Sequence, residues 1–319
     1  MSDTFQMTFH GTRGSRTMNG AECVEWGGHT TCVGILAGER QIILDAGSGV
    51  VPLGESMVKA HYCRPDRGSL VSYLFVTHTH YDHICGLPYY VPFYVPESTT
   101  YFYGPRNPYM SFRETIERFI HPPYHPVPMH EMQGVVRWGE VGEPDSIFFV
   151  RGQQEPVVVN LRHPELRHLA PPAEEVETAI HTMHGYNHPK CGVTIYKVQH
   201  AGRTVVFATD VEGYVMGDQR LIAFSRNADV LIHDAMYTRD RYASTNGPTQ
   251  GWGHSTIEIA TEVASKADVG KLVLVHHDPG HSDAKLTEME AAAQAMFPRT
   301  VSGRDGMVID LLASPPTRP

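Results

Sequence analysis

The stretch FVTHTHYDHICGLP, residues 75–88, places three histidines and one aspartate within six consecutive positions, directly after an apolar run. Side chains two apart on a strand share a face, so His78 and His80 should point the same way from the end of that run. Asp82 and His83 follow where the strand must end, before a glycine and a proline that allow a tight turn. Such residues are also ordinary in exposed turns, but four ligand-type side chains that converge from one strand end suit two metal ions better than one.

Length and net charge limit the number of domains and the kinds of partner to be expected. The chain has 319 residues, 41% of them apolar, which is enough to bury a full core and near the upper limit for one domain. Its 26 basic residues stand against 35 acidic ones, a formal charge of −9, and the basic residues are scattered. A duplex nucleic acid needs a clustered basic face. We therefore expect a small anionic molecule as substrate and neither duplex nucleic acid nor a membrane as partner; a homodimer is compatible with the sequence.

The cysteines and the first residues bear on the compartment. The five cysteines are odd in number and form no C-x-x-C pair, which is typical of free thiols in a reducing compartment. Cys85 lies beside the histidine-rich stretch, where we expect a small buried side chain facing the helix rather than a ligand. The start of the chain lacks a cationic region followed by an apolar one, and no run approaches the ~18 apolar residues of a membrane span. These features predict a cytoplasmic protein.

Alternating β-rich and helical stretches predict a sheet in each half of the chain. Strands are expected over residues 4–9, 30–36, 40–47, 70–78, 193–198, 204–210, 229–235 and 271–277. Helices are expected over residues 50–60, 218–225, 255–265 and 283–297. Such alternation predicts sheets covered by helices, with functional residues at the strand ends. The two halves should form two layers of one sandwich.

The pattern loosens between about residues 97 and 178. This segment is rich in Tyr, Phe, His and Pro and includes YFYGPRNPYM and HPPYHPVP. We predict an irregular excursion over the surface. Its aromatic side chains are expected to pack the loop or a dimer contact, and the alternative is that they stack on a flat group such as a nucleobase.

The histidine-rich stretch resembles the H-x-H-x-D-H signature of the metallo-β-lactamase superfamily. Four further stretches resemble the other motifs of that family in the same order: LDAGSG over residues 44–49, NHP over residues 187–189, FATD ending at Asp210, and LVLVHHD over residues 272–278. The resemblance spans most of the chain. It implies an α/β fold, the αββα four-layer sandwich, as a single domain over residues 1–319 that carries the excursion at about 97–178 as an irregular insertion.

Carried over position by position, the resemblance implies that seven side chains hold two divalent metal ions. The ligands would be His78, His80 and His188 for one ion, Asp82, His83 and His276 for the second, and Asp210 as the bridge. This mixture suits Zn²⁺ at about 2.0 to 2.2 Å, and Mn²⁺ or Fe would also accept it. Asp45 is expected to orient a ligand histidine from behind, or to be a structural carboxylate at a strand end.

Two of the ligand positions leave alternatives open. His277 directly follows His276, and neighbours on a strand point to opposite faces, so only one of the two can face the metals. We prefer His276, which follows the apolar run in the phase of the family motif. His181 and His184 compete with His188 for the third motif, and His188 is preferred.

A stretch near the end of the chain narrows the reaction. Two neighbouring metal ions can hold a hydroxide and polarise the oxygen of an ester, lactone, thioester or phosphodiester alike. In GWGHSTIEIA, residues 251–260, Ser255 and Glu258 form an S-x-x-E capping box that predicts a helix start. His254 would then lie beside the positive helix end, where it can meet a phosphate and protonate its leaving oxygen. The element resembles one in the ribonuclease Z and phosphodiesterase branch of the superfamily; a plain capped helix is the alternative.

Two glycine-rich stretches also resemble that branch. HGTRGS, residues 10–15, and GGHTTC, residues 27–32, resemble its cyclic-nucleotide phosphodiesterase-like members, which usually carry Asn where this chain has His29. Arg13 is the side chain there most able to reach an anion, because its planar fork binds phosphate in a bidentate manner. The alternative is that the glycines only permit turns.

These features together predict a dinuclear metal-dependent hydrolase, a phosphodiesterase that opens a small, cyclic nucleotide-like phosphodiester by attack of the shared hydroxide. The residues expected to act are His254, Asp82 and Asp210 in catalysis, and Arg13 and Ser255 in substrate binding. A lactonase or other ester hydrolase is the alternative. A tRNA 3′-processing endonuclease is less favoured, because residues 189–209, where that family inserts its tRNA-gripping arm, suffice for one hairpin only. A non-catalytic metal-binding module is also less favoured, since it should have lost ligands and none is missing.

Overall fold

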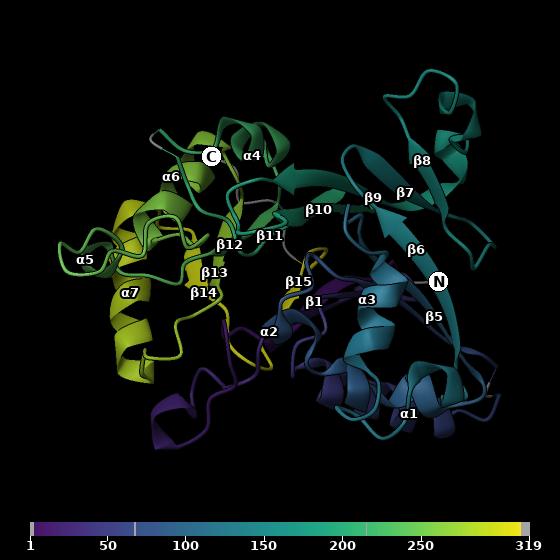
Figure 1. Ribbon diagram of the computed structural model, residues 1–319. Helices are drawn as coiled ribbons and strands as arrows, with labels where there is room; N and C mark the ends of the chain where they lie inside the picture. Colours follow the sequence, from purple (N-terminus) through teal and green to yellow (C-terminus); the bar gives the residue numbers. More distant parts are fainter. Residues whose placement is uncertain (1–2, 67, 215, 314–319) are drawn as a thin grey trace.

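The computed structural model describes residues 3–66, 68–214 and 216–313 (Figure 1). Two β-sheets face each other, and helices cover the outer face of each sheet, so the layers follow the order αββα (Figure 1). The predicted fold class is confirmed.

The first sheet is built mainly from the first half of the chain, in the order β15-β1-β2-β3-β4-β5-β6. Its strands are β1 Phe5–Gly11, β2 Cys32–Ala37, β3 Arg40–Leu44, β4 Leu70–Phe75, β5 Ser98–Pro105, β6 Val135–Val141 and β15 Val308–Asp310. Strands β1 to β3 pair antiparallel, whereas β3 to β6 run parallel. The ends of β3 and β4 therefore lie at the same edge of the sheet.

The second sheet is built from the later part of the chain, in the order β14-β13-β12-β11-β10-β9-β7-β8. Its strands are β7 Asp145–Val150, β8 Val157–Asn160, β9 Val176–Gly185, β10 Val193–His200, β11 Arg203–Ala208, β12 Val230–Asp234, β13 Lys271–Val275 and β14 Thr300–Ser302. Strands β11 to β14 run parallel, and β12 is buried along its whole length, as expected for a strand covered on both faces.

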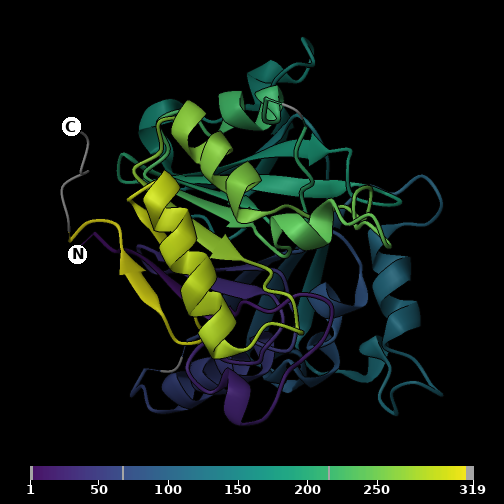
Figure 2. The ribbon, with the colours of Figure 1, turned by 90° about the vertical axis from the view of Figure 1, so that its left-hand side faces the viewer.

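Helices cover both sheets. The α-helices are α1 Val50–Tyr62, α2 Tyr81–Ile84, α3 Phe112–Phe119, α4 Gln219–Phe224, α5 Arg239–Tyr242, α6 Ile257–Lys266 and α7 Asp283–Met296. One-turn 3₁₀ helices are η1 Ala21–Cys23, η2 Leu87–Tyr89, η3 Val91–Tyr94, η4 Met129–Glu131, η5 Arg167–Leu169 and η6 Ala173–Glu175. Helices α1 and α3 lie against the first sheet, while α6 and α7 lie side by side over the second (Figure 2).

Three apolar clusters hold the four layers together. The central cluster joins the inner faces of the two sheets, where Phe75 stacks on Tyr103 with 5.0 Å between ring centroids and meets Tyr196 edge-on at 5.6 Å. The other two clusters lie between each sheet and its helices, and include Leu53 on α1 and Val263 on α6. Apolar area buried on both faces of each sheet is the main stabilising term of this architecture.

The segment 97–178 carries more regular structure than its sequence pattern indicates. Strands β5 and β6 extend the first sheet, and β7 and β8 join the second. The connections around α3 and between β8 and β9 are the less regular parts. The sequence pattern misses these strands because their apolar and polar residues do not alternate regularly, whereas pairing with neighbouring strands in the fold stabilises them.

Two further properties concern the helices and the cysteines. None of the helices in the described part of the chain is both long and apolar enough to span a bilayer. All five cysteines are free thiols.

Candidate metal centre

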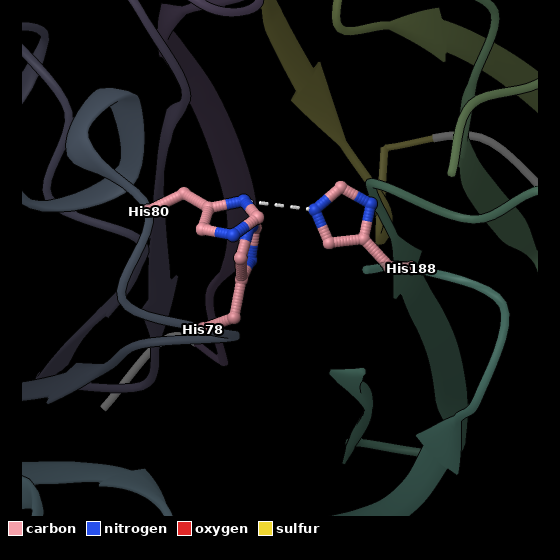
Figure 3. Close-up of side chains that lie close together, drawn as sticks. All are labelled: His78, His80 and His188. Carbon is pink, nitrogen blue, oxygen red and sulfur yellow. Dashed lines mark hydrogen bonds between the residues drawn. The ribbon is translucent and has the colours of Figure 1, made fainter. Parts of the chain in front are cut away.

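Three histidines meet where the end of strand β4 lies beside the loop that connects β9 and β10. His78 and His80 follow β4, and His188 comes from the loop between β9 and β10 (Figure 3). Their rings lie 4.4 to 4.8 Å apart between centroids, and Nδ1 of His80 is 2.9 Å from Nε2 of His188. One nitrogen from each lies within 4.8 Å of the other two, which is close enough to share one metal ion.

A second group of ligand-type side chains adjoins the first. Asp82 and His83 lie on α2, and His276 follows β13. Oδ2 of Asp82 is 3.1 Å from Nε2 of His276 and 3.4 Å from Nε2 of His83. These three residues form a separate set of potential ligand atoms within 4.8 Å of one another.

Asp210, which follows β11, lies between the two groups. Its Oδ2 is 3.1 Å from Nε2 of His83, and its Oδ1 is 3.3 Å from Nε2 of His276. The same Oδ1 lies 3.6 Å from Nε2 of His188 and 3.8 Å from Nε2 of His78. One carboxylate thus faces histidines of both groups, the placement that a bridging ligand requires.

Asp45 supports the cluster from behind. This fully buried carboxylate at the end of β3 accepts a hydrogen bond from Nδ1 of His83 at 2.8 Å and from the backbone amide of Thr77 at 2.7 Å. Burial raises the pKa of Asp45, and the bonds from His83 and Thr77 counteract that effect. The contact directs Nε2 of His83 towards Asp82 and Asp210, as a ligand-orienting carboxylate does.

The donor set fits divalent cations. Nε2 of His78 and Nε2 of His83 are buried without a hydrogen-bond partner although they face carboxylates, a costly arrangement that a cation between them would relieve. Burial acts to raise the pKa of Asp210, but His276, His83 and His78 outweigh it and hold that pKa well below its usual range. Burial acts to lower the pKa of His276, whereas Asp210 and Asp82 raise it to about 9. The electrostatics of the cluster thus favour positive charge beside Asp210 and Asp82, which divalent ions would supply.

The geometry separates the alternatives for the ligand positions. His277 faces away from the cluster: its Nε2 donates to the carbonyl of Gly303 at 3.0 Å, and burial lowers its pKa to about 3. His181 bonds to Ser146 on the outside of the second sheet. His184 packs against the ring of Tyr186. The structure therefore places His276 and His188 among the clustered side chains. The alternatives His277, His181 and His184 lie outside the cluster.

An aspartate that the sequence analysis missed completes the centre. Asp234 ends β12, and its Oδ2 accepts a hydrogen bond from Nδ1 of His254 at 2.7 Å. The ring of His254 stacks on that of His276 with 4.7 Å between centroids. Asp210, Asp234, His254 and His276 form a further set of potential ligand atoms within 4.8 Å. The available signal was the β-rich stretch DVLIHDA, residues 229–235, in which an aspartate stands at the strand end, as it does in the first and fourth motifs.

The predicted capping box is shifted by one residue. Thr256, rather than Ser255, caps α6 by accepting a hydrogen bond from the amide of Ile259 at 3.4 Å. Ser255 is fully buried and donates its hydroxyl to the carbonyl of Val211, so the hydroxyl that was predicted to bind substrate is engaged inside the protein. The sequence offers two adjacent hydroxyls, and a tertiary hydrogen bond decides which one caps the helix.

Arg13 does not reach the site as predicted. Its side chain is fully buried, where Nε donates to the carbonyl of Gly27 at 3.0 Å and one terminal nitrogen donates to the carbonyl of His281 at 2.7 Å. Asp283 lies 3.6 Å from the other terminal nitrogen. The guanidinium thus joins the N-terminal loop to the segment before α7. Gly14, the next residue, packs on His276 so closely that a Cβ would lie 2.3 Å from the ring.

Two facing sheets with a His and Asp cluster at one edge define the class of αββα metal-site proteins. The chain belongs to the beta-lactamase superfamily, whose domain family matches residues 40–277. Ribonuclease Z from Prochlorococcus marinus (strain NATL1A) is 34% identical over 113 residues, 34% of this chain and 33% of that protein. Ribonuclease Z from Halalkalibacterium halodurans is 26% identical over 274 residues, 75% of this chain and 80% of that protein. The predicted superfamily is confirmed, and relatives named ribonuclease Z are consistent with the predicted branch. The match to the first of these relatives spans about a third of its length.

Solved structures share the fold. The metallo-β-lactamase fold protein YhfI from Bacillus subtilis superposes with a TM-score of 0.61 at 17% identity, covering 97% of this chain and 100% of that one. Human tRNase Z, short form, superposes with a TM-score of 0.60 at 17% identity, covering 95% of this chain and 98% of that one. Unliganded yeast PDE1 superposes with a TM-score of 0.61 at 13% identity, covering 97% of this chain and 100% of that one.

The comparisons correct the prediction about partners. A small anionic substrate and no duplex nucleic acid were expected from the acidic net charge and the scattered basic residues, but curated relatives of the chain are named ribonuclease Z. Net charge describes the whole surface, whereas cleavage of a nucleic acid needs only a local site that accepts its backbone. The scattered basic residues therefore do not exclude a nucleic-acid substrate.

Proposed function

We propose that the chain is a dinuclear metal-dependent phosphodiesterase. The proposed ligands are His78, His80 and His188 for one ion, Asp82, His83 and His276 for the other, and Asp210 between them. The mixed His and carboxylate set favours Zn²⁺, and Mn²⁺ or Fe would also fit it. The observation that carries the proposal is the pairing of His254 with Asp234 beside this cluster.

The chain's own residues have separate roles in this proposal. When bound, the two ions supply a nucleophilic water at neutral pH and polarise a phosphoryl oxygen. His254 keeps Nε2 free because Nδ1 is bonded to Asp234, so Nε2 can donate a proton to the leaving oxygen of the ester. Oδ2 of Asp82, held by the amide of Ser15 at 2.7 Å, is positioned to take up a proton from the attacking water. An alkoxide leaving from phosphorus needs such an acid, which favours phosphodiesters.

RNA is the substrate class that we propose, because the curated relatives are ribonucleases Z. The chain between His188 and Asp210 forms a short loop and the β10–β11 hairpin. Contacts to RNA beyond the cleaved bond therefore have to come from other parts of the surface.

The leaving group tests the role of His254. His254→Ala should keep both metal ions but lower kcat by roughly 10² to 10⁴ on a short single-stranded RNA or a 2′,3′-cyclic nucleotide, the range for a lost general acid. The loss on bis-p-nitrophenyl phosphate should be much smaller, since nitrophenolate leaves without a proton. Exposed His163→Ala is the matched control and should change neither rate.

Two results would contradict these assignments. Equal losses on RNA and on the nitrophenyl ester would limit His254 to a positioning role. If the metal-loaded wild type leaves every phosphodiester intact and opens lactones instead, the chain is an ester hydrolase.

A further inference from the structure

A pocket of about 250 Å³ opens beside the metal centre, between α2 and the loop that follows β1. Its lining includes Tyr81, Tyr89 and Arg16, together with Thr30 and Ser48. Sites that enclose a whole small ligand usually measure about 300 to 1,000 Å³. This pocket therefore suits one unit of a larger substrate.

The pocket and the metal centre share the same two segments of chain. Tyr81 lies directly before Asp82 on α2, and Cys85, four residues on, lines the pocket from the same helix face. The loop after β1 touches the centre through Ser15, whose amide donates to Oδ2 of Asp82 at 2.7 Å, and then continues to Arg16. A group in the pocket would thus lie next to the proposed site of cleavage.

The lining is suited to a base and a phosphate. The side chains of Tyr81 and Tyr89 are 67% and 62% exposed, so their ring faces are accessible to a flat partner. Among the described residues, Arg16 donates to the carbonyl of Thr17 and to the sulfur of Met18, and no carboxylate forms an ion pair with it. Its guanidinium is therefore available to an anion.

The pocket wall is fixed before any ligand binds. The amide of Ser48 donates to Oγ1 of Thr30 at 2.8 Å, and the amide of Thr30 donates to Oγ of Ser48 at 2.9 Å. This reciprocal pair needs no rearrangement to accept a ligand, so less entropy is lost on binding.

We propose that this pocket binds the nucleoside next to the scissile phosphodiester, with the base against Tyr89 and Tyr81 and a flanking phosphate on Arg16. The inference rests on the proposed phosphodiesterase function and adds to it a nucleoside-binding subsite. Base stacking on aromatic side chains tolerates any base, so the subsite selects a nucleoside rather than a sequence.

Two esters with the same leaving group test the subsite by turnover. Thymidine 5′-(p-nitrophenyl phosphate) carries a nucleoside and lacks a 2′-hydroxyl that could attack the phosphate, whereas methyl p-nitrophenyl phosphate has no base. Tyr89→Ala should lower kcat/KM about five- to hundredfold on the thymidine ester, the range for one stacked base, and leave the methyl ester unchanged. Tyr89→Phe should retain the wild-type rate because it keeps the ring, and Tyr109→Ala, which removes an exposed ring outside the pocket, is the control.

The outcomes separate this inference from the proposed function. Equal losses on both esters, or no loss on either, would overturn the subsite while phosphodiester hydrolysis stands. If the wild type hydrolyses neither ester but cleaves RNA, the proposed function stands and the binding test decides the subsite.

For the binding test, thymidine 5′-monophosphate and 2-deoxyribose 5-phosphate are titrated and followed by saturation-transfer NMR. Tyr89→Ala should weaken only the nucleotide, and Arg16→Gln should weaken both. Binding that is absent, or that both variants leave unchanged, would overturn the subsite.

Discussion

At the scale of single residues, two neighbouring histidines differ in orientation: His276 belongs to the candidate metal site and His277 to the core. His276 faces Asp82 and Asp210, whereas His277 turns to the carbonyl of Gly303 and meets the edge of the Trp26 ring at 6.1 Å. His276 also adopts a left-handed backbone, with φ of 61°. Because the two side chains point in opposite directions, the same substitution should affect the metal site at His276 and the packing of the core at His277.

The two histidines provide a matched pair of variants. His276→Ala should reduce the metal content of purified protein, because the substitution removes one proposed ligand. His277→Ala should leave the metal content near that of the wild type and instead lower the free energy of unfolding, since a buried ring is lost, by about 2 to 4 kcal/mol. Elemental analysis and denaturant unfolding measure the two effects. The reverse pattern of metal loss would exchange the roles of the two residues.

His10 on β1 makes stability depend on pH. Burial, with a smaller contribution from His29, lowers its pKa to about 4, below the ~6.5 of an unfolded chain. Between these values the unfolded chain binds more protons than the folded one, so stability is fully present above pH ~6.5 and falls as the pH drops towards 4. The wild type should lose about 1 to 2 kcal/mol through His10 between pH 7 and pH 5.

The measurement is denaturant unfolding at pH 7 and pH 5 for the wild type, His10→Gln and the exposed control His130→Gln. The loss on acidification should be smaller in His10→Gln than in the other two proteins. An identical loss in all three would show that His10 titrates normally in the folded state.

At the scale of elements, strand ends and one loop position the functional side chains. Asp45, Asp210 and His276 follow β3, β11 and β13, and all three have positive φ, between 53° and 61°. This conformation costs roughly 1 to 2 kcal/mol for a residue other than glycine, and it turns each side chain back over the sheet edge. Local strain of this kind is typical of functional sites.

The connection between α5 and α6 is held by one buried carboxylate. Oε1 of Glu212 accepts hydrogen bonds from the hydroxyl of Tyr242 and the amide of Gly251, both at 2.7 Å, and Oε2 accepts one from the amide of Gly253 at 2.9 Å. The carbonyl of Gly253 in turn accepts a hydrogen bond from Nδ1 of His188 at 3.1 Å. Glu212 thus positions the backbone that precedes His254 and orients His188.

Substitution of Glu212 should loosen this connection. Glu212→Gln presents an NH₂ group to one of the two amides, so one hydrogen bond to the loop is lost. Hydrogen exchange over residues 243–253 should become faster, and kcat should fall about tenfold on substrates that need His254, with most of the metal retained. Glu262→Gln, on the exposed face of α6, is the control. Unchanged exchange in Glu212→Gln would show that the loop is held by other contacts.

At the scale of the whole molecule, the proposed ligands come from both sheets. His78, His80, Asp82 and His83 follow β4 of the first sheet, whereas His188, Asp210 and His276 follow strands of the second. Metal ions at this edge would join the two sheets at a point where the apolar core between them ends.

Removal of metal should therefore lower the thermal stability of the whole fold. A ligand at 1,000 times its dissociation constant stabilises the folded state by about 4 kcal/mol, so a chelator should lower Tm by several degrees, and returning Zn²⁺ should restore it. Asp210→Ala should lose most of this response, because the shared carboxylate serves both ions. A wild-type Tm that is indifferent to chelation, with elemental analysis showing the metal gone, would contradict the proposed link between the sheets.

The sequence predicted much of the candidate site because its motifs are local. Four of the seven proposed ligands lie within residues 78–83, and strand periodicity alone places two of them on one face. It failed where two adjacent residues are chemically alike: the hydroxyls of Ser255 and Thr256 are equally able to cap a helix. It failed for Arg13 because an arginine suited to bind an anion is equally suited to bind backbone carbonyls.

By itself, the sequence determined most of the strand and helix order outside residues 97–178, and it singled out the side chains able to bind metal, while its resemblance to a known family implied the αββα class. Only the tertiary structure decided which of these side chains meet. Asp234 joins His254 across 20 residues, Ser15 contacts Asp82 across 67, and Asp82 meets His276 across 194. Such contacts depend on how the two sheets pack, because packing brings strand ends of opposite sheets to one edge, and no local pattern along the chain encodes that distance.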